Sequence, residues 1–556
     1  MMRRNDNQEI APDEIFLDAT NLPAYDTYQF EGRIEKPITF KTIVLVGFVF
    51  ALIAIGYATR VWALQIQNGK EYSDLAENNR LDHTIIFADR GIIYDRNHVP
   101  IAWNEAKTET DFNLRQYIQK DGFAHLLGYI KYPKKDSSGF YYSTEAEGVS
   151  GIEKEYNTML GGTNGLQLIE INALNEHESE NTIRNPKHGE SLVTSIDSRV
   201  QSALYKTIKD VAEEVGFVGG GGLLMDLETG ELIAMTSYPE FSPQVLTDGT
   251  STAMINEYIQ SESKPFINRL TTPYTPGSIL KPIMALGALT EGVITPDTVI
   301  VSNGSISIPN RYDPDNPSIF NDWKAHGPLT VRSAIANSSN VFFYEVGGGF
   351  GNIKGLGIAR IEKYVREFGY GENLQESFLK GHVGTIPNPE WKEKNFDGDP
   401  WRLGDTYFTA IGQYGFQATP LQVLRAMGTI ANKGTMVEPT ILKRDKPVVS
   451  SVIKDIPEKY FTIVHEGMRQ GAIEGTARAL NVSYTTFAGK TGTAELGISK
   501  AKVNSWVTGF FPYENPRYAF VIVMEKGGRA NLIGAAAAAR RFFDWMNIYT
   551  PEYFKV

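Results

Sequence analysis

An apolar run near the N-terminus constrains this chain more than any other feature. Residues 42–59 (TIVLVGFVFALIAIGYAT) contain no charged side chain, and after Arg60 the apolar character continues to residue 66. About 20 apolar residues span the hydrocarbon core of a bilayer, and Arg60 can reach toward the interface beside Trp62. A buried helix or a cleaved signal peptide are the alternatives, but the long polar segment before the run argues against a cleaved signal. We expect one uncleaved membrane anchor over residues 42–66.

The flanking charges suggest how this anchor is oriented. Arg33, Lys36 and Lys41 lie just before the run, whereas Arg60 and one lysine follow it. Basic residues are retained preferentially on the cytoplasmic side, so this small bias favours a cytoplasmic N-terminus. Residues 1–41 would then be a short disordered tail in the cytoplasm. The large remainder of the chain would lie outside the membrane.

Composition excludes several classes of protein. With 556 residues, of which 42% are hydrophobic, the chain can fill the cores of two or three domains. Its net charge of −11 argues against a nucleic-acid partner held by a basic surface. The absence of cysteine excludes disulfides, thiolate catalysis and cysteine-ligated metals, although it does not fix the compartment.

The first part beyond the anchor mixes short strand-like runs with polar loops. Residues 84–87 are expected to form a strand, and the spacing of apolar residues predicts a helix over 201–214. A charged segment near residues 115–130 is also expected to be helical. We assign residues 67–215 to a non-catalytic pedestal domain that resembles a dimerisation domain.

A second, larger domain is expected over residues 216–556. The run Gly219–Gly222 marks a break, after which residues 223–236 predict a hairpin. Helices and strands then alternate to the end of the chain. The last strand is expected at residues 518–525 and the last helix at residues 535–546.

The first chemical motif is a serine one helical turn before a lysine, in TPGSILKP at residues 275–282. A Ser-x-x-Lys pattern alone says little, because four other copies occur in the chain. Ser278 differs in following a Pro-Gly turn and opening an apolar helical run, so Lys281 can reach its hydroxyl. A helix N-terminus favours negative charge near Ser278, and burial of Lys281 would lower its pKa and let it act as a base. An N-capping serine beside a solvated lysine explains the motif alone equally well.

The second motif is Ser338-Ser339-Asn340, which lies between two apolar stretches. If buried, its two hydroxyls and its amide would need hydrogen-bond partners. Taken alone, a turn between two helices explains it better than a functional site does.

The third motif, Lys490-Thr491-Gly492-Thr493, occurs once and is placed to lie on an edge strand that lines a cleft. The two-residue period of a strand would direct Thr491 and Thr493 to one face. Gly492 has no side chain, so the backbone of a ligand could lie against it. Taken alone, the motif is also compatible with an ordinary strand end.

In this order the three motifs are typical of class A β-lactamases and penicillin-binding proteins. The chain resembles one branch closely, the class B penicillin-binding proteins, and within them the elongation transpeptidases of the penicillin-binding protein 2 type. Further matching segments are RGIIYDRN at 90–97, GIEKEY at 151–156, Asn268-Arg269, IGQ at 411–413, TPLQ at 419–422 and SWVTG at 505–509. The resemblance implies a mixed α/β (α+β) fold, in which an antiparallel sheet flanked by helices forms the transpeptidase domain. A mixed α/β pedestal and one transmembrane helix would precede it.

The resemblance also implies peptidoglycan D,D-transpeptidation through an acyl-enzyme. Ser278 would attack the penultimate D-alanine carbonyl of a stem peptide with Lys281 as base, and the backbone N–H groups of Ser278 and Thr493 would form the oxyanion hole. Ser338 would relay a proton to the departing D-alanine, and Lys490 would tune the field. The amine of a second stem peptide would then resolve the acyl-enzyme.

The remaining site residues follow from the same resemblance. Asn340 would hold the amide of the donor peptide, while Thr491 and Thr493, beside Gly492, would bind the terminal carboxylate. β-Lactam antibiotics would acylate the same serine, and no metal or organic cofactor is required. The implied location is the inner membrane with the catalytic domain outside the cytoplasm. The implied partners are a multi-span glycosyltransferase, which would supply the glycan strand, and other proteins of the elongation machinery.

Two departures from the family pattern stand out. His98 replaces the usual glycine, and Asn340 replaces the aspartate that is frequent in the elongation branch, which leaves a septal role open. Some relatives bind zinc near the cleft, in a stretch that here contains Asp313, Asp315, Asp322 and His326. Aspartate and histidine can ligate zinc, but without a cysteine we expect a solvated acidic loop rather than a metal site.

Other functions on the same fold are a D,D-carboxypeptidase or a β-lactamase, and the long anchored non-catalytic part argues against both. A different class is a β-lactam sensor or an inactive scaffold for wall synthesis. An intact set of motifs argues against inactivity, and a sensor would carry several membrane spans where one is expected.

Overall fold

The computed structural model describes residues 39–70, 72, 81–171, 177–310, 313, 315–497 and 499–555. The chain divides into two compact units, one with residues 1–84 and 167–183, the other with residues 85–166 and 184–556. The tail expected over residues 1–41 lies outside the described residues except for residues 39–41.

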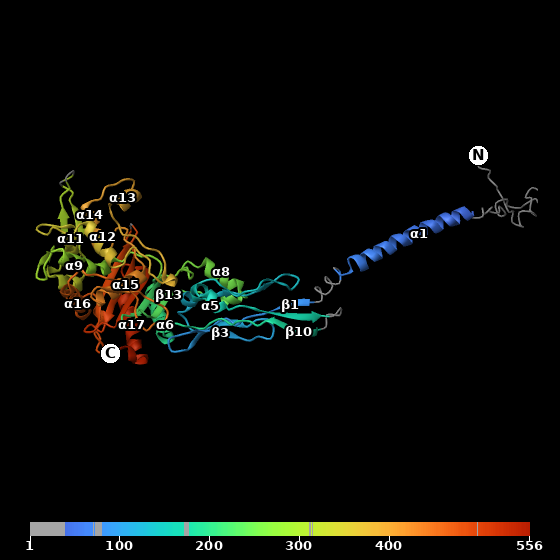
Figure 1. The fold of residues 1–556 in the computed structure, drawn as a ribbon. Helices are drawn as coiled ribbons and strands as arrows, with labels where there is room; N and C mark the ends of the chain where they lie inside the picture. The colour runs from blue at the N-terminus through green and yellow to red at the C-terminus, as the bar shows by residue number, and fades with distance from the viewer. Residues whose placement is uncertain are drawn as a thin grey trace, which may run out of the picture. The chain divides into compact units, whose positions relative to one another are not determined.

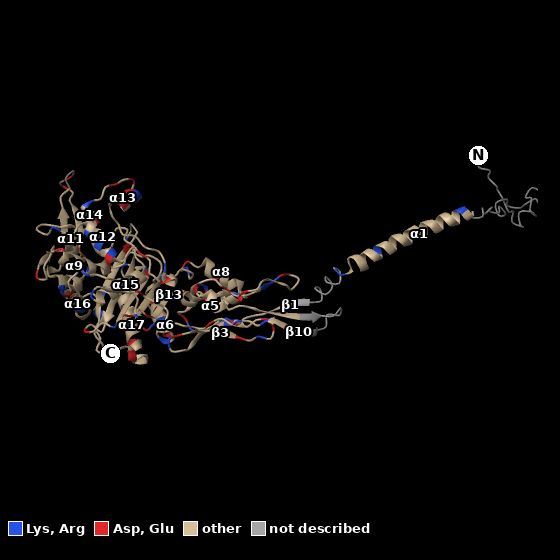
Figure 2. Ribbon diagram, viewed as in Figure 1, with Lys and Arg blue, Asp and Glu red and all other residues tan. Residues whose placement is uncertain are grey.

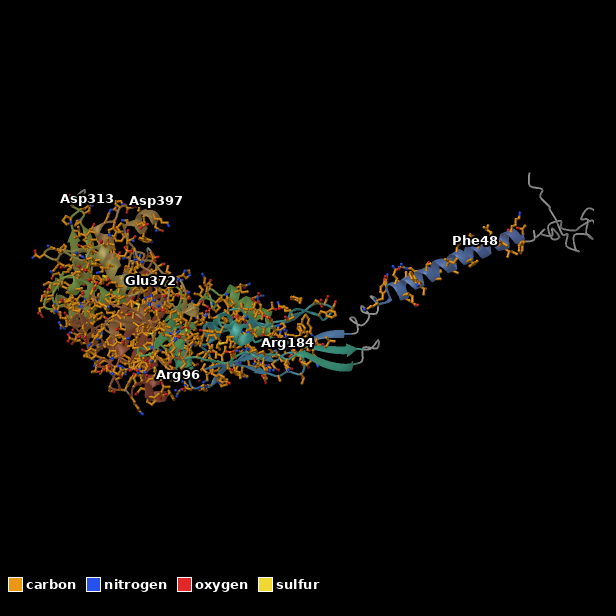
Figure 3. The ribbon with its side chains drawn as sticks, in the orientation of Figure 1. Phe48, Arg96, Arg184, Asp313, Glu372 and Asp397 are labelled. Carbon is orange, nitrogen blue, oxygen red and sulfur yellow. The ribbon has the colours of Figure 1, made fainter. Side chains whose placement is uncertain are left out.

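The first unit contains the apolar helix that the sequence predicts. Helix α1 spans Phe40–Trp62 and continues as a wider turn, Ala63–Gln67, so that the two cover the expected anchor. Its mean hydropathy reaches 2.3, and none of its residues is buried. Figure 2 shows no acidic residue on α1, and in Figure 3 the side chains of this helix, Phe48 among them, point outward. By length and composition α1 can cross a bilayer.

Most of a three-stranded sheet belongs to the same unit. Its strand order is β1-β9-β10, with β1 at Leu81–Ile86, β9 at Gly165–Ile171 and β10 at His177–Arg184. The strand expected at residues 84–87 is therefore the end of β1.

The second unit begins with a small four-stranded sheet in the order β11-β2-β3-β4. Strands β2 and β11 are parallel, and the other pairs are antiparallel. The strands are β2 Ile93–Tyr94, β3 Pro100–Glu105, β4 Leu114–Tyr117 and β11 Leu192–Val193. Around them lie α3 Ala124–Leu127, α4 Gly151–Glu155, α5 Asn157–Gly161 and the paired strands β5 Ile130–Lys131, β8 Glu147–Gly148, β6 Lys134–Lys135 and β7 Tyr141–Ser143.

The helix expected near residues 115–130 is wrong for most of its length. Residues 114–117 form strand β4, in which Arg115 and Tyr117 are buried on one face, and only residues 124–127 are helical. Gly122 and Gly128 have positive φ values of 102° and 73°, which end any regular helix between them. Arg115, which suggested a solvated helix face, is instead buried in an ion pair.

A five-stranded antiparallel sheet forms the centre of the larger part of this unit (Figure 1). Its order is β13-β12-β22-β21-β20, so β20 is an edge strand, as the third motif predicts. The strands are β12 Gly219–Asp226, β13 Leu232–Tyr238, β20 Ala488–Leu496, β21 Lys502–Phe511 and β22 Tyr518–Gly528. The predicted hairpin is β12–β13, and the predicted last strand is β22.

The break expected at Gly219–Gly222 is wrong, because these glycines are the buried first half of β12. A Cβ atom on Gly222 would lie 2.9 Å from the side chains of Ile208 and Leu204. The glycines therefore let helix α6 pack closely on the sheet instead of ending a domain.

The two faces of the sheet contact different cores. Along β22, Ala519, Val521 and Val523 belong to one hydrophobic cluster, whereas Phe520, Ile522 and Met524 belong to another. This alternation follows from the two-residue period of a strand. Helices α6 Ser198–Val215 and α17 Ala535–Tyr549 cover one face, and α15 Pro420–Ala431 packs on the other.

A helical region adjoins the second face and gathers at one side of the sheet in Figure 1. It contains α9 Lys281–Thr290, α10 Val331–Asn337, α11 Asn340–Gly348, α12 Ile358–Glu367, α13 Pro389–Asn395, α14 Leu403–Ala410 and α16 Glu458–Ile473. Smaller elements are α7 Pro243–Asp248, α8 Thr252–Gln260 and the strand pairs β14 Ile300–Ser302 with β17 Gly327–Leu329, β15 Ser305–Ile308 with β16 Ser318–Asn321, and β18 Thr435–Val437 with β19 Val449–Val452.

Candidate active site

Ser278 lies on a short 3₁₀ segment, Gly277–Leu280, that leads directly into α9. Gly277 has a φ of 60°, and its N–H donates a hydrogen bond of 2.9 Å to the Gly412 carbonyl. Pro282 is accommodated because it lies in the first turn of α9, where its missing N–H is not needed. The segment holds Ser278 half-buried, one turn before Lys281.

Lys281 is fully buried, and its ammonium contacts the second motif. Its Nζ donates to the Ser338 carbonyl at 2.7 Å and to Asn340 Oδ1 at 2.8 Å, and lies 3.5 Å from Ser338 Oγ. Burial lowers the pKa of Lys281 to about 7, although the Asp322 carboxylate acts in the opposite direction. A large fraction of this lysine is therefore neutral near pH 7 and able to accept a proton.

Ser338 occupies the turn between α10 and α11 in a left-handed conformation, with φ 58° and ψ 34°. This conformation is uncommon for a residue other than glycine. Its hydroxyl lies near two lysines: Lys490 Nζ donates to Ser338 Oγ at 2.8 Å, and Lys281 Nζ lies 3.5 Å from the same oxygen. The turn between two helices that the sequence favoured is therefore present, and it brings the Ser338 hydroxyl into contact with Lys490.

Lys490 is buried at the edge of the sheet, on β20. Its Nζ also donates to the Thr491 carbonyl at 2.9 Å. Burial, together with the positive charge of Lys281, holds the pKa of Lys490 well below its usual range. Two ammonium groups that contact one hydroxyl repel each other, so this site disfavours the state in which both are charged.

The threonines of the third motif are at least partly accessible on the edge strand β20. Thr493 is exposed, and Thr491 is half-buried with its Oγ1 at 2.7 Å from Thr476 Oγ1. The role predicted for Gly492 needs correction, since a Cβ there would lie 2.8 Å from the Pro276 carbonyl and 3.0 Å from Ile279. The missing side chain makes room for the segment that carries Ser278.

The first and third motifs therefore meet directly. A Cβ atom on Gly277 would lie 3.0 Å from the Thr493 carbonyl, and Trp506 on β21 donates a hydrogen bond of 3.0 Å to the Thr275 carbonyl. Together with the contacts of Lys281 and Lys490, these bring residues from all three motifs to one site.

The stretch considered for zinc does not fit a zinc site. Among the described residues, no group of three or more His, Cys, Asp and Glu side chains could hold a metal. Asp313 and Asp315 are exposed, and Figure 3 shows Asp313 at the outer edge of the helical region. The Asp322 carboxylate is already occupied by protein donors, and His326 Nε2 lies 3.6 Å from it.

Sequence reasoning missed three residues that shape the site. Asp322 binds the second motif, Thr476 contacts Thr491, and Gly412 accepts the Gly277 N–H. Gly412 belongs to a segment that matches the family, but Asp322 was weighed only as a metal ligand. Thr476 has no sequence signal that would single it out.

The two matching segments before the catalytic part also meet. Arg90 Nε and Arg115 Nε donate to the two oxygens of buried Glu153 at 2.5 and 2.7 Å. Burial alone would raise the pKa of Glu153, but Arg115 and Arg90 outweigh it and lower that pKa. Asp95 extends the connection, because its carboxylate accepts hydrogen bonds from the N–H groups of Asn97, Val99 and Ser198, the last at the start of α6.

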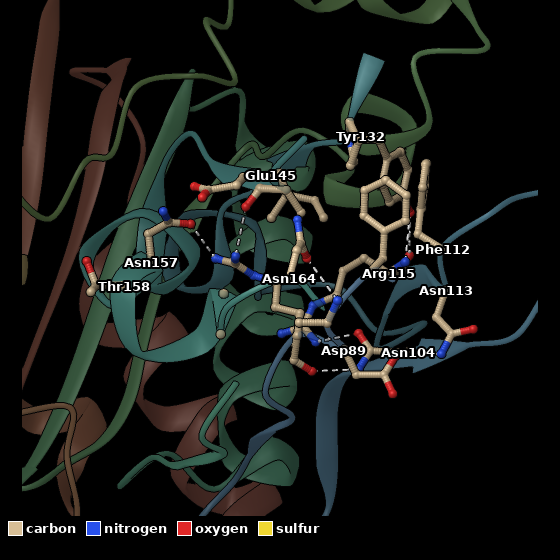
Figure 4. Close-up of a pocket in the computed structure, with 18 residues that line it drawn as sticks. Asp89, Asn104, Phe112, Asn113, Arg115, Tyr132, Glu145, Asn157, Thr158 and Asn164 are labelled. Atoms are coloured by element: carbon tan, nitrogen blue, oxygen red, sulfur yellow. Dashed lines mark hydrogen bonds between the residues drawn. The ribbon is translucent and has the colours of Figure 1, made fainter. Parts of the chain in front are cut away.

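Beside this ion triad is a cavity of about 250 Å³, drawn in Figure 4. Its walls include Phe87, Phe112 and Tyr132, with Glu145 at its exposed side. None of the three motifs lines it, so it is separate from the site around Ser278.

Comparisons with known proteins agree with this geometry. The penicillin-binding protein transpeptidase domain matches residues 220–544, and the penicillin-binding protein dimerisation domain matches residues 108–194. The peptidoglycan D,D-transpeptidase MrdA of Haemophilus influenzae is 30% identical over 481 residues, which cover 79% of this chain and 70% of that protein. The protein of the same name from Escherichia coli is 26% identical over 614 residues, covering 91% and 94%.

Two solved structures are similar as well. One is the complex between penicillin-binding protein 2 and MreC from Helicobacter pylori, with a TM-score of 0.70, 27% identity and coverage of 85% of this chain and 99% of that one. Another is penicillin-binding protein 2 of Pseudomonas aeruginosa in complex with WCK 5153, with a TM-score of 0.68, 29% identity and coverage of 84% and 97%. Since the transpeptidase domain spans more than half of the sequence, this chain belongs to the penicillin-binding protein transpeptidases and is similar to those of the penicillin-binding protein 2 type.

Proposed function

We propose that this chain is a membrane-anchored peptidoglycan D,D-transpeptidase that cross-links stem peptides through a serine acyl-enzyme during cell-wall elongation. The observation that carries the proposal is that Lys281, one turn after Ser278, is fully buried and has a pKa lowered to about 7. A buried lysine with no carboxylate in direct contact is suited to take the proton of a nucleophile.

In the proposed first step, Lys281 removes the proton of Ser278, and Ser278 Oγ attacks the penultimate D-alanine carbonyl. The backbone N–H groups of Ser278 and Thr493 stabilise the oxyanion. The close approach of Gly277 to Thr493 supports this pairing. The bond to the terminal D-alanine breaks as its nitrogen receives a proton through Ser338, which contacts Lys490.

The proposed substrate contacts use the accessible edge of β20. Thr491 and Thr493 bind the terminal carboxylate of the donor peptide, and Asn340, which is half-buried, holds the peptide amide. In the second step the amine of another stem peptide attacks the acyl-enzyme and releases Ser278. A β-lactam would acylate Ser278 by the same first step and then leave slowly.

For location and partners we propose a single span through the cytoplasmic membrane, with the catalytic domain outside the cytoplasm. Helix α1 supports the anchor. Residues 67–215 would be the non-catalytic pedestal and residues 216–556 the transpeptidase domain. A complex with MreC and a complex described as a peptidoglycan synthase are known for similar structures. We extend this to a partner glycosyltransferase and other elongation proteins here.

Labelling with a fluorescent penicillin tests the chemistry. The full chain, purified in detergent, should acquire a covalent label, and Ser278→Ala should acquire none. Ser261→Ala, which alters another Ser-x-x-Lys sequence, is the matched control and should label normally. Equal labelling of the full chain and Ser278→Ala would remove Ser278 from the mechanism.

The cellular role needs a separate test, because Asn340 leaves a septal function open. Depletion of the protein should make rod-shaped cells round if it serves elongation. Filaments would point to septal synthesis instead.

A further inference from the structure

One buried carboxylate outside the three motifs collects an unusual number of hydrogen bonds. Asp322 follows β16, and its side chain is fully buried. Its Oδ1 accepts from the N–H groups of Asn340 and Trp323, both at 2.9 Å. Its Oδ2 accepts from Ser339 Oγ at 2.6 Å and from Val341 N–H and Ser302 Oγ, both at 3.0 Å.

Three of these donors are consecutive residues at the start of α11. The first N–H groups of a helix have no partner within it, and a carboxylate there is favoured by the helix dipole. Hydrogen bonds to an ionised acceptor are also the stronger ones. Asp322 therefore fixes residues 339–341 as one rigid group, from outside the helix.

The fixed group is the one that receives the Lys281 ammonium. Asn340 Oδ1 and the Ser338 carbonyl are the two close acceptors of Lys281 Nζ, and Ser338 Oγ is the acceptor of Lys490 Nζ. A shift of residues 338–340 would move every one of these acceptors at once. Ser338 also needs an outside support, because its left-handed backbone is intrinsically unfavourable.

We propose that Asp322 is a positioning residue of the acyl-transfer site, which holds the Ser338–Asn340 turn in the geometry that aligns Lys281 and Lys490. This inference rests on the proposed function of Ser278. Asp322 contacts neither the nucleophile nor the substrate position, and it acts through the turn. In this chain the Asp322 carboxylate accepts hydrogen bonds directly from residues 339–341, and these bonds provide the support.

The charges around Lys281 make the proposal separable from simple helix capping. Asp322 is the carboxylate that raises the pKa of Lys281 against its burial, while Lys490 is the neighbouring cation. Asp322 itself stays ionised, since the hydrogen bonds from Asn340, Ser339 and Val341 outweigh the burial that would raise its pKa. Tyr344 and Lys324 are further titratable groups near this carboxylate and His326. Burial lowers the pKa of His326, so its side chain does not neutralise Asp322 near pH 7.

Asp322→Asn removes the negative charge. It also places the N–H groups of an amide opposite the hydrogen-bond donors of Ser339, Asn340 and Val341. The turn should shift, and the second-order rate of acylation by a fluorescent penicillin should fall by about 100-fold, the usual consequence of misplacing a catalytic group. Loss of the negative charge should also lower the pKa of Lys281. The rise of the rate with pH should therefore move to lower pH, which a purely structural defect would not cause.

Asp313→Asn is the matched control, because it makes the same change on the exposed part of the same stretch. It should keep both the rate and the pH profile of the unmodified full chain. Rates are measured between pH 5 and 9 on protein in detergent, with the melting temperature of each variant recorded alongside.

Ser339→Ala provides a second test that keeps the charge. It removes one hydrogen bond to Asp322 and the N-cap of α11, so acylation should slow by about fivefold, the worth of one hydrogen bond, with an unmoved pH profile. If Asp322→Asn does not fold, this variant decides, and a rate equal to that of the unmodified chain overturns the proposal.

The outcomes remain distinct from failure of the proposed function. An unmodified chain that takes no label refutes the transpeptidase proposal itself. A labelled chain whose Asp322→Asn variant acylates at the same rate refutes the positioning role. Slow acylation with the pH profile in place reduces Asp322 to a structural cap and also overturns the proposal.

Discussion

Two buried centres in this protein each hold a pair of cations, and they solve the same electrostatic problem differently. In the pedestal, Glu153 lies between Arg90 and Arg115. In the catalytic domain, the Ser338 hydroxyl lies between Lys281 and Lys490. The first centre supplies a counter-charge and keeps its ions. The second has a neutral hydroxyl between its lysines, and burial lowers the pKa of both lysines.

The choice of cation follows from this difference. Arginine stays protonated in proteins and binds carboxylates with two donors, which suits a permanent structural link. Lysine changes its pKa readily when buried, which suits a group that must exchange a proton. Both centres are buried, so burial alone does not separate them; what differs is whether a carboxylate contacts the cations.

The largest effect on this comparison is expected when the lysine proposed as the base is replaced by a cation that cannot lose its proton. Lys281→Arg should reduce acylation by a fluorescent penicillin by roughly 1000-fold, because the base can no longer be neutral. Lys392→Arg is the control, since Lys392 is also buried but is paired with Asp405 and Asp399. A Lys281→Arg variant that acylates at the normal rate would contradict the assignment of the base.

The reciprocal change removes the counter-charge from the pedestal. Glu153→Gln leaves two buried guanidinium groups without a carboxylate, and the free energy of unfolding should fall by about 3–5 kcal/mol. Chemical denaturation followed by fluorescence measures this loss. Glu145→Gln, at the exposed side of the nearby cavity, should leave stability unchanged, and equal stability of the two variants would show that the triad is not a unit.

The pH dependence of acylation sharpens the contrast. The proposed base, Lys281, has to be neutral to accept a proton, so the rate should increase as pH rises through its pKa of about 7 and then level off. Below that value the rate should fall by about tenfold for each pH unit. A rate that is flat between pH 5 and 8 would mean that Lys281 is not the titrating base.

The smallest effect is expected where a charge pair lies in solvent. Lys135 and Asp111 are 2.6 Å apart but about half exposed. Water and salt screen such a pair, so Lys135→Ala should not change the melting temperature measurably. A clear loss of stability would mean that proximity, rather than burial, sets the strength of these pairs.

The sequence predicted the features that depend on local pattern. Helix α1 follows from uninterrupted hydrophobicity and α6 from helical spacing, and the last helix α17 and the edge strand β20 were expected where they lie. The three motifs were identified by their order, and the structure brings their residues together at one site.

Features that depend on distant partners were not predictable. Arg115 resembles a solvated helical residue until Glu153, far along the chain, neutralises it. Asp322 resembles a loop acid until residues 339–341 surround it. Gly219–Gly222 resembles a linker until α6 packs against it. In each case the deciding contact joins residues that no local pattern connects.

The glycine contacts around the nucleophile have a consequence for substrate range. The backbone of Gly412 packs against the backbone of Gly277, and the backbone of Gly492 packs against the Pro276 carbonyl, with no room for a Cβ atom on Gly412 or Gly492. The distance between the segment that carries Ser278 and strand β20 is thereby set by van der Waals contact of the backbone, which substitutions elsewhere do not change. Evolution toward other acyl donors would have to act on the accessible hydroxyls of the neighbouring strand, while the spacing at the nucleophile stays constant.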